Sequence, residues 1–360
     1  MIAIQQGKTL SKAVLWLLIL FSSGWGAGNT AFADINKGLI VMTRNLYDGT
    51  DRTGLLEATT FPEFVAAVDF AYSNMLNTKP KDRLALIAKE IAANKVDVVA
   101  LQEASIWRTG TSSLITGSVT PAETVQFDFL QILLDELKRL NEFYAVAGVL
   151  PGLDVQLPGS FQDIRLTDRD VIIYRRDLLN RGIQVTNLQE QDYLSQASYP
   201  VAALNVQVTE RSGWVSIDLV QGKLTTRVAA THLNFNPSFD PTIATAQAKE
   251  LLATAGNSSL RTVLLGDFNS NAGNPLDPTF ATYQTILNGG YKDAWLVNGN
   301  AAGVTCCQDE DLANTVSNLS VRYDLILIKG ISGRRAQIVG DQQLSGLWPS
   351  DHAGVIATLR

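Results

Sequence analysis

Short apolar stretches that alternate with amphipathic ones constrain the fold of this chain more than any other feature. Residues 38–47 ("GLIVMTRNLY") and 96–103 ("VDVVALQE") are rich in aliphatic and β-branched side chains, which is typical of buried strands. Residues 62–76 and 82–94, between them, repeat apolar side chains with the period of a helix. Residues 214–233 have the pattern of a hairpin that turns at Gln221 and Gly222. Because strands alternate with helices but also pair in hairpins, the sequence predicts an α/β protein with mixed sheets and outer helices.

The remaining segments fit the same plan. We expect further helices at 123–141, 242–255 and 280–289, and further strands at 144–150, 169–177, 261–269, 322–330 and 352–360. Two segments rich in Gly, Ser, Thr or Pro, 109–120 and 151–160, are expected to be loops. An apolar fraction of 46% supplies ample core material for such a domain.

Polar side chains gather where the apolar strands end. They are Asn45, Glu103, His232, Asp267 with Asn269, and Asp351 with His352, while Asp324 begins the strand expected at 322–330. A carboxylate is costly to bury alone, so each of these acids must be paired, hydrated or bound to a metal. In α/β sheets, sites form where strands end and loops begin. The chain contains only two histidines, and both lie at such positions. This placement predicts that they belong to a functional site.

The first 33 residues have the pattern of a signal peptide. Lys8 and Lys12 precede an apolar stretch at 13–21, and residues 31–33 ("AFA") form an A-x-A cleavage site. The apolar stretch is too short to cross ~30 Å of hydrocarbon as a helix, and no other stretch reaches ~18 apolar residues. We therefore expect a mature domain at 34–360 that is secreted or periplasmic, with no transmembrane segment.

The mature chain is acidic. Removing the two leader lysines changes the formal net charge from −6 to −8. This balance argues against a broad basic surface for nucleic acid. A local patch that includes Arg165, Arg169, Arg175 and Arg176 is compatible with it.

The only two cysteines, Cys306 and Cys307, are adjacent. Neighbouring Cα atoms lie ~3.8 Å apart, below the ~4.4–6.8 Å that disulfides usually span. The sequence leaves open whether they form a vicinal disulfide or stay free thiols. In either case an exported chain without a disulfide framework must depend on its core for stability.

Six short motifs together resemble the endonuclease/exonuclease/phosphatase superfamily. "RNLY", "VDVVALQE", "THL", "LLGDFNS", "RYDLIL" and "SDHAGV" occur in the order found in that superfamily, and the resemblance covers residues 39–359. Its members include pancreatic-type deoxyribonuclease, abasic-site endonucleases, secreted bacterial sphingomyelinases and inositol-polyphosphate 5-phosphatases. The resemblance implies a four-layer α-β-β-α sandwich of two packed mixed sheets flanked by helices. It also implies cation-assisted hydrolysis of phosphoric esters at one end of the sheets.

The resemblance also implies a role for each polar residue. Glu103 looks like the principal metal carboxylate, with Asn45 beside it and Asp351 in the same metal site. Asp267 and Asn269 are similar to the pair that positions water and phosphate. His352 looks like the catalytic histidine paired to Asp324, and His232 like the second histidine of the nuclease and sphingomyelinase branches. Tyr47 stands where some members have an acidic ligand, so a further ligand from the following Asp48 or Asp51 is left open.

The residue types suit this chemistry without reference to any family. A phosphodiester repels hydroxide, so hard oxygen ligands must hold a divalent cation against the phosphate, and Glu103 and Asn45 supply such oxygens. We expect Mg²⁺, with Mn²⁺ or Ca²⁺ as alternatives. Histidine is the natural group to move a proton near neutral pH, and Asp324 could orient His352 for this.

The substrate is left open by the sequence. The expected function is a secreted, metal-dependent phosphodiesterase that acts on nucleic acid or on phospholipid as a monomer. A phosphomonoesterase and a catalytically idle binding module with the same fold are the alternatives. Arg169 is a candidate phosphate contact, and a surface salt bridge is the other interpretation of that residue.

Overall fold

The computed structural model describes residues 38–235, 240, 242–299 and 301–360. Residues Leu39–Arg360 form one compact unit. The leader expected at 1–33 lies outside the described residues. Within them, no helix is both long enough and apolar enough to cross a membrane.

The larger sheet has eight strands and contains both termini of the compact unit. Its order is β15-β16-β1-β2-β6-β3-β4, with β5 paired to β6. The strands are β1 (Leu39–Asn45), β2 (Val98–Gln102), β3 (Ile106–Thr111), β4 (Thr124–Asp128), β5 (Tyr144–Pro158), β6 (Gln162–Arg175), β15 (Gly333–Val339) and β16 (Gly354–Leu359). β1 and β2 are parallel, whereas β16 pairs with β1 in the antiparallel direction, so the sheet is mixed.

The second sheet has six strands in the order β13-β14-β12-β11-β10-β7. They are β7 (Ile183–Asp192), β10 (Gly213–Gln221), β11 (Leu224–His232), β12 (Arg261–Asp267), β13 (Lys292–Asp293) and β14 (Asp324–Lys329). The predicted hairpin is the β10–β11 pair, which turns between Gln221 and Leu224. A separate two-stranded sheet consists of β8 (Ala197–Val201) and β9 (Val206–Glu210).

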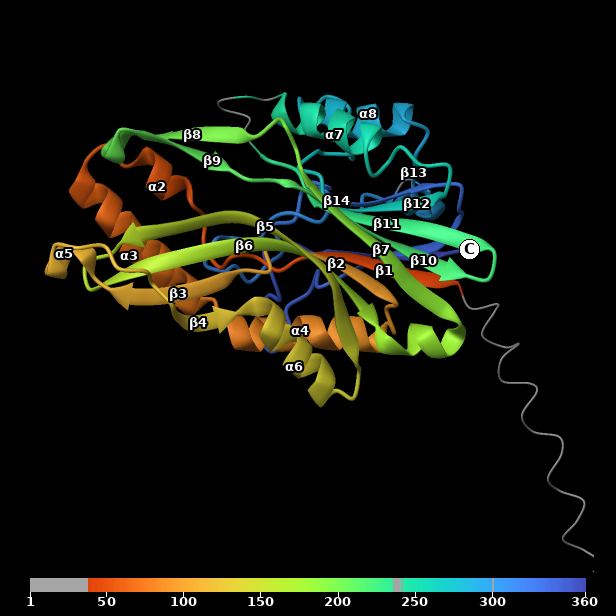
Figure 1. Ribbon diagram of the computed structural model, residues 1–360, viewed down its shortest axis with the longest axis horizontal. Helices are drawn as coiled ribbons and strands as arrows, with labels where there is room; N and C mark the ends of the chain where they lie inside the picture. The colour runs from red at the N-terminus through yellow and green to blue at the C-terminus, as the bar shows by residue number, and fades with distance from the viewer. Residues whose placement is uncertain (1–37, 236–239, 241, 300) are drawn as a thin grey trace, which may run out of the picture. The chain divides into compact units, whose positions relative to one another are not determined.

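Helices cover the outer face of each large sheet (Figure 1). α3 (Phe61–Asn77), α4 (Pro80–Ala93) and α6 (Phe129–Arg139) pack on the eight-stranded sheet, and α7 (Ile243–Ala253) and α8 (Phe280–Asn288) pack on the other. A third core, between the two sheets, is built from Val, Ile, Leu and Ala side chains. The shorter helices are α2 (Thr53–Glu57), α5 (Ser113–Thr116), η1 (Arg176–Arg181), η2 (Ala202–Leu204) and η3 (Ala294–Asn298). The predicted four-layer sandwich is confirmed.

Three local predictions were wrong. The loop expected at 109–120 contains the end of β3 and the short helix α5. The helix expected from residue 123 begins at Phe129, because Thr124–Asp128 pairs with β3 as an edge strand. The loop expected at 151–160 belongs to β5, which runs to Pro158. β5 pairs with β6, and Pro151 and Pro158 are tolerated there because a strand with one free edge does not need every N–H donor.

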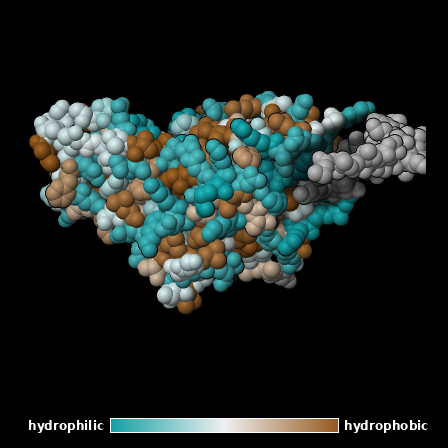
Figure 2. Space-filling view, turned by 90° about the horizontal axis from the view of Figure 1, so that it is seen from below, coloured by the Kyte–Doolittle hydropathy of each residue, from teal (hydrophilic) through white to brown (hydrophobic). Residues whose placement is uncertain are grey.

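Exposed apolar side chains do not form one continuous surface on the face shown in Figure 2. Hydrophilic and hydrophobic residues are intermixed there. The most exposed large apolar residues of the described chain include Phe161 and Leu276, which come from separate turns. Single exposed apolar residues are ordinary in soluble domains.

Candidate active site

The register of the strands brings the polar strand ends together. Asn45 pairs with Gln102 where the parallel strands β1 and β2 end. In the other sheet, Asp267 pairs with His232 on one side and with Asp324 on the other. β1 and β2 pack against β11, β12 and β14 across the sandwich, so both sets of ends meet at one edge. Residues separated by hundreds of positions thereby form one cluster.

Gly266 allows two of these strands to lie close together. A Cβ atom at this position would collide with the carbonyl oxygen of Thr231 on β11. The glycine immediately precedes Asp267, and Thr231 immediately precedes His232. The glycine of the "GDFN" motif therefore helps to bring the Asp267 carboxylate beside the His232 ring.

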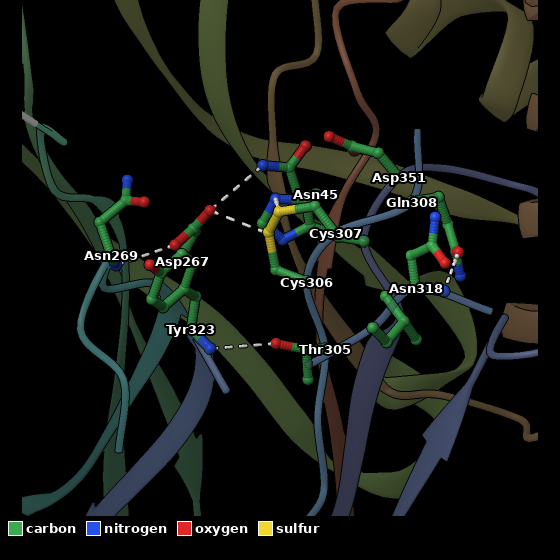
Figure 3. Close-up of a disulfide and its surroundings, with 12 residues drawn as sticks. Asn45, Asp267, Asn269, Thr305, Cys306, Cys307, Gln308, Asn318, Tyr323 and Asp351 are labelled. Carbon is green, nitrogen blue, oxygen red and sulfur yellow. Dashed lines mark hydrogen bonds and ion pairs between the residues drawn. A yellow bond between two sulfur atoms is a disulfide. The ribbon is translucent and has the colours of Figure 1, made fainter. Parts of the chain in front are cut away.

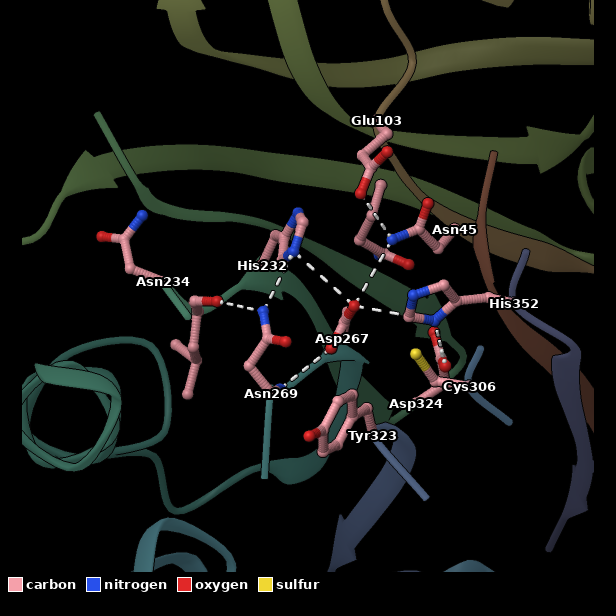
Figure 4. Close-up of polar contacts among 12 residues, drawn as sticks. Asn45, Glu103, His232, Asn234, Asp267, Asn269, Cys306, Tyr323, Asp324 and His352 are labelled. Carbon is pink, nitrogen blue, oxygen red and sulfur yellow. Dashed lines mark hydrogen bonds and ion pairs between the residues drawn. The ribbon is translucent and has the colours of Figure 1, made fainter. Parts of the chain in front are cut away.

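Asp267 lies at the centre of the cluster (Figure 4). Its Oδ2 atom is 3.6 Å from Nε2 of His232 and 3.7 Å from Nδ1 of His352. The amide of Asn45 donates to the same oxygen at 3.3 Å. Its other oxygen accepts from the backbone N–H of Asn269 at 2.9 Å. Both histidines of the chain therefore flank a single buried carboxylate.

His352 is fixed by the side chain that was predicted for it. Its Nδ1 atom lies 2.8 Å from Oδ2 of Asp324, and both side chains are buried. The backbone oxygen of His352 accepts from the buried guanidinium of Arg44 in β1. Burial disfavours the imidazolium, but the charges of Asp324, Asp351 and Asp267 outweigh it and raise the pKa of His352 well above its usual value.

His232 also lies among carboxylates. Burial lowers its pKa, but Asp267, Asp170 and Glu103 raise it to about 9. Its Nε2 atom is 3.3 Å from the side-chain amide of Asn269, which donates to the backbone oxygen of Leu233 at 2.7 Å. The neighbouring carboxylates thus favour the imidazolium form of the ring, which can donate to a negatively charged group.

Glu103 and Asn45 are neighbours, as expected for two residues of one metal site. The Asn45 amide donates to Oε1 of Glu103 at 2.9 Å, and the backbone N–H of Asp48 donates to Oε2 at 2.6 Å. Asp351 and Glu103 both line a cavity at this edge of the sheets. Its carboxylate accepts from Ser350 at 3.2 Å, and burial raises its pKa to about 6.

Three residues of the site region turn sharply out of strands. Tyr47, Glu103 and Asn269 have φ values of 63°, 55° and 46°, which non-glycine residues seldom adopt. Each follows a strand end by one or two residues. Such backbone conformations persist where the surroundings fix them, and they are concentrated at functional sites.

A buried arginine holds two of the loops at this edge. Arg83 of α4 donates to the backbone oxygens of Leu46, Tyr47, Thr78 and Pro349 at 2.9–3.2 Å. The first two follow β1, and Pro349 precedes Asp351 and His352. Arg83 thus links the loop after Asn45 to the loop that contains His352.

Sequence reasoning missed two aspartates of β6. Asp168 and Asp170 are both buried and line the site cavity. Burial, together with Asp48 and Glu103, raises the pKa of Asp168 to about 7, and burial raises that of Asp170 well above its usual value. The sequence did contain a signal for them, since two acids at i and i+2 lie on the same strand face as Ile164, Leu166 and Ile172.

The candidate basic residues lie outside the site. Arg169 donates to the backbone oxygen of Ala104 at 2.7 Å and pairs with Asp128 at 2.6 Å. Of the two interpretations of Arg169, a phosphate contact and a salt bridge, the structure therefore agrees with the salt bridge. Arg165 pairs with Asp154, and Arg175 with Asp177.

The loop after β1 contributes Asp48. This carboxylate is buried, and Arg52 lies 3.9 Å from it. Burial and the neighbouring Glu103 raise its pKa to about 7. Asp51 bonds instead to the backbone and hydroxyl of Thr53. Of the two acids left open by the sequence, Asp48 is the one that lies against Glu103.

The adjacent cysteines form a disulfide (Figure 3). Of the two states that the sequence left open, this is the bonded one. The Sγ atom of Cys307 lies 3.9 Å from Nε2 of His352. The disulfide therefore forms part of the wall around the imidazole.

Two sets of three ligand-type groups converge within the described part of the chain. One is Asp267, Asp324 and His352, and the other is Cys306, Cys307 and His352. The first set lies inside the cluster described above. All of these residues except Asp324 line one cavity of about 510 Å³, together with Glu103 and His232.

Comparison with known proteins agrees with the geometry. The model of the endonuclease/exonuclease/phosphatase family matches residues 71–352. Among curated protein sequences, none matches this chain. Solved structures that are similar to it include three for which the similarity covers 89% of this chain. One is an endonuclease/exonuclease/phosphatase family protein from Leptotrichia buccalis, with a TM-score of 0.53, 15% identity and 99% of that chain covered. The second is a protein of the same family from Bacteroides thetaiotaomicron, with a TM-score of 0.51, 14% identity and 97% of that chain covered. The third is a humanized D. rerio TDP2, with a TM-score of 0.50, 14% identity and 98% of that chain covered. At these identities the similarity shows the fold alone.

Proposed function

Because the chain belongs to the endonuclease/exonuclease/phosphatase family, we propose that it is a divalent-cation-dependent hydrolase of phosphodiester bonds. The observation that carries the proposal is the position of Asp267 between the two histidines, 3.6 and 3.7 Å away. A carboxylate between two cationic rings can accept a proton from water while the rings stabilise a phosphoryl group.

The donors at this edge suit a hard cation. The Asn45 amide donates to the Glu103 carboxylate, the Oδ1 atom of Asn45 accepts from the backbone N–H of Tyr47, and Asp351 lines the same cavity as Glu103. Several neighbouring acids, including Asp48 and Asp168, have raised pKa values because they are buried beside like charges. Oδ1 of Asp170 is buried with no hydrogen-bond partner among the described residues. Mg²⁺, Mn²⁺ or Ca²⁺ held here would neutralise charge on the phosphate and favour the attack of water.

The remaining steps belong to the side chains of the protein. Asp267 accepts the proton of the attacking water as the new P–O bond forms, and Asn269 holds the phosphate and the ring of His232 in place. His232 donates to a phosphoryl oxygen. His352, whose pKa is raised, gives its proton to the leaving oxygen as the old P–O bond breaks. Asp324 positions His352 and stabilises its charged form.

We also propose that the protein is exported. The support is the sequence pattern of the leader, in which two lysines precede a short apolar stretch and "AFA". The N-terminus of the protein recovered outside the cytoplasm should begin near Asp34. A chain that begins before Gly24, or that remains embedded in membranes, would contradict this proposal.

A panel of substrates tests the activity. Purified protein is assayed on plasmid DNA, RNA, sphingomyelin and a phosphomonoester, with Mg²⁺ and with EDTA. Hydrolysis of at least one phosphodiester in Mg²⁺ alone is expected. Turnover that EDTA leaves intact contradicts the cation mechanism, turnover of the phosphomonoester alone favours a phosphatase, and no turnover at all favours a binding module.

A further inference from the structure

The catalytic cluster is only one end of its cavity. The same cavity of about 510 Å³ continues away from His232 and Asp267 until it reaches side chains of α3. Cores normally close such spaces, because a void deprives the surrounding atoms of contacts. A cavity of this size that opens at a catalytic cluster lies in the range typical of small-molecule sites.

One wall of this extension comes from the long β5–β6 hairpin. Its side chains are aliphatic: Leu150, Val155, Leu157, Ile164 and Leu166. Leu166 pairs with Val155. Asp168 lies two residues after Leu166, so the two side chains are on the same face of β6. The wall therefore changes from aliphatic to acidic along a single strand, and the acidic end is the catalytic one.

The opposite walls are also apolar. α2 and α3 contribute Leu55, Phe64 and Val68, and the β8–β9 hairpin contributes Val201 and Val208. α2 contacts β8, α3 contacts β5 and η2, and β5 contacts β9, so these elements enclose the space together. In Figure 1 they lie at one end of the molecule, around the far ends of β5 and β6.

The charges around the cavity disfavour a polyanion. Of the described residues that line it, Arg52 and Arg211 are the only cationic ones besides the two histidines. Arg52 pairs with Glu210 at 3.1 Å, and Arg211 pairs with Asp192 at 2.8 Å. Nucleic acids are held chiefly by lysines and arginines at successive phosphates. This cavity instead offers one phosphate position and an aliphatic compartment.

We infer that the substrate is a phosphodiester with an aliphatic chain, and that the compartment between β5–β6, α2–α3 and β8–β9 holds this chain. The inference rests on the proposed function, because it takes the phosphate to lie at the catalytic cluster. Burying a methylene group is worth ~0.8 kcal/mol, which corresponds to about a fourfold gain in binding. A chain that fits should therefore increase kcat/KM step by step until the compartment is full.

The test uses alkyl 4-nitrophenyl phosphates with methyl, butyl, octyl and dodecyl chains, in Mg²⁺ and below their micellar concentrations. We expect kcat/KM to rise by about two- to fourfold per methylene over the shorter chains and then to level off. Equal kcat/KM for the methyl and dodecyl esters would overturn the inference. So would a single-stranded oligonucleotide that is cleaved with a higher kcat/KM than every ester.

Two matched variants localise the effect. Val155→Trp fills the compartment, whereas Val146→Trp makes the same change on the same strand at a site that is 41% exposed and outside the cavity lining. The Val155→Trp variant should hydrolyse the methyl ester normally but lose most of the increase in kcat/KM with chain length. The Val146→Trp variant should keep that increase. Identical profiles for the two variants would contradict the inference. If Val155→Trp does not fold, Val208→Trp on the facing hairpin takes its place.

A binding measurement separates this inference from the proposed function. Dodecylphosphonate and methylphosphonate are titrated into the protein by calorimetry, which requires no turnover. Tight binding of the dodecyl compound alone, with no ester hydrolysed, would support the compartment and contradict the phosphodiesterase. Hydrolysis of all esters with equal binding of both phosphonates would support the enzyme and contradict the compartment.

Discussion

The Nδ1 atom of His352 lies 2.8 Å from the Oδ2 atom of Asp324, with both side chains buried. The two residues come from β14 and from the segment before β16, which belong to different sheets. This contact therefore joins the two halves of the sandwich at the site. It also leaves the Nε2 atom of His352 directed toward the disulfide wall of the cavity.

The first prediction concerns this pair. His352→Ala should lose roughly 10²–10⁴-fold in kcat, the usual effect of removing a general acid or base. Asp324→Asn should lose a large part of the same factor, because the ring is left with the wrong tautomer or orientation. Since both side chains serve one proton transfer, the double variant should be little worse than His352→Ala.

Steady-state kinetics and thermal unfolding of the three variants check this prediction. A purely structural pair would instead lower Tm and leave kcat per folded molecule near that of the wild type. Near-normal kcat in folded His352→Ala would end the catalytic interpretation.

The second prediction concerns the cation. Glu103→Gln keeps the size of the side chain but removes the charge that attracts Mg²⁺, so activity should fall by orders of magnitude while the fold persists. Half-maximal activity should require more Mg²⁺ in the variant. Glu136→Gln, on the surface of α6, is the matched control. Equal Mg²⁺ dependence in both variants would exclude Glu103 as a ligand.

The third prediction concerns pH. The pKa of His232 is raised to about 9, so its contribution to stability is complete below its unfolded pKa of ~6.5 and is lost as pH rises through about 9. In the folded protein the pKa values of Asp48 and Asp168 are raised to about 7, whereas the unfolded chain releases these protons at its ordinary, lower pKa. The stability that these protonated acids contribute is therefore lost as pH rises through about 7. All three shifts have the same sign. The metal-free protein should therefore be less stable at about pH 8.5 than at about pH 5.5.

Mg²⁺ should reverse this trend, because it binds the deprotonated acids. Thermal unfolding at the two pH values, with Mg²⁺ and with EDTA, measures the effect. The rise in Tm on adding Mg²⁺ should be larger at the higher pH and smaller in Glu103→Gln. An equal rise at both pH values would contradict the assignment of a cation to these acids.

The fourth prediction concerns Arg83. Arg83→Met removes the donor shared by the backbone oxygens of Leu46, Tyr47 and Pro349, which remain buried. Unsatisfied buried groups cost ~1–3 kcal/mol each, so the free energy of unfolding should fall by about 3 kcal/mol or more. Urea unfolding measures this against Arg139→Met, an exposed position on α6 that should change by less than ~0.5 kcal/mol. Equal losses in the two variants would contradict the anchoring role.

The fifth prediction concerns the cysteines. Because Cys306 and Cys307 are joined in a disulfide, unreduced protein should take up no thiol-alkylating reagent even when unfolded. After reduction by a dithiol, both Cys306 and Cys307 should be alkylated. Mass spectrometry distinguishes these states, and alkylation of unreduced protein would show free thiols.

The fold class and most of the candidate cluster could be predicted from the amino-acid sequence. Apolar strands that end in Asn45, Glu103 and Asp267 are local patterns, and the polar ends of a folded sheet meet wherever its strands run side by side. The residue types also limited the chemistry, since hard oxygens with two histidines favour a cation and a proton transfer. These conclusions needed no knowledge of which strand lies next to which.

Features that depend on partners distant in sequence became visible only in the folded structure. Residues 124–128 lie in the stretch expected to be helical, yet they pair with β3, because ladder hydrogen bonds to a neighbouring strand add to the strand preference of Thr124, Val125 and Phe127. Asp168 and Asp170 became site residues, and Arg169 did not, because the face that β6 turns toward the cavity is fixed by its pairing with β2, β3 and β5. The aliphatic compartment is formed by α2, α3 and two hairpins that no local pattern connects. Its existence depends on how closely these elements pack, and packing is a property of the folded chain.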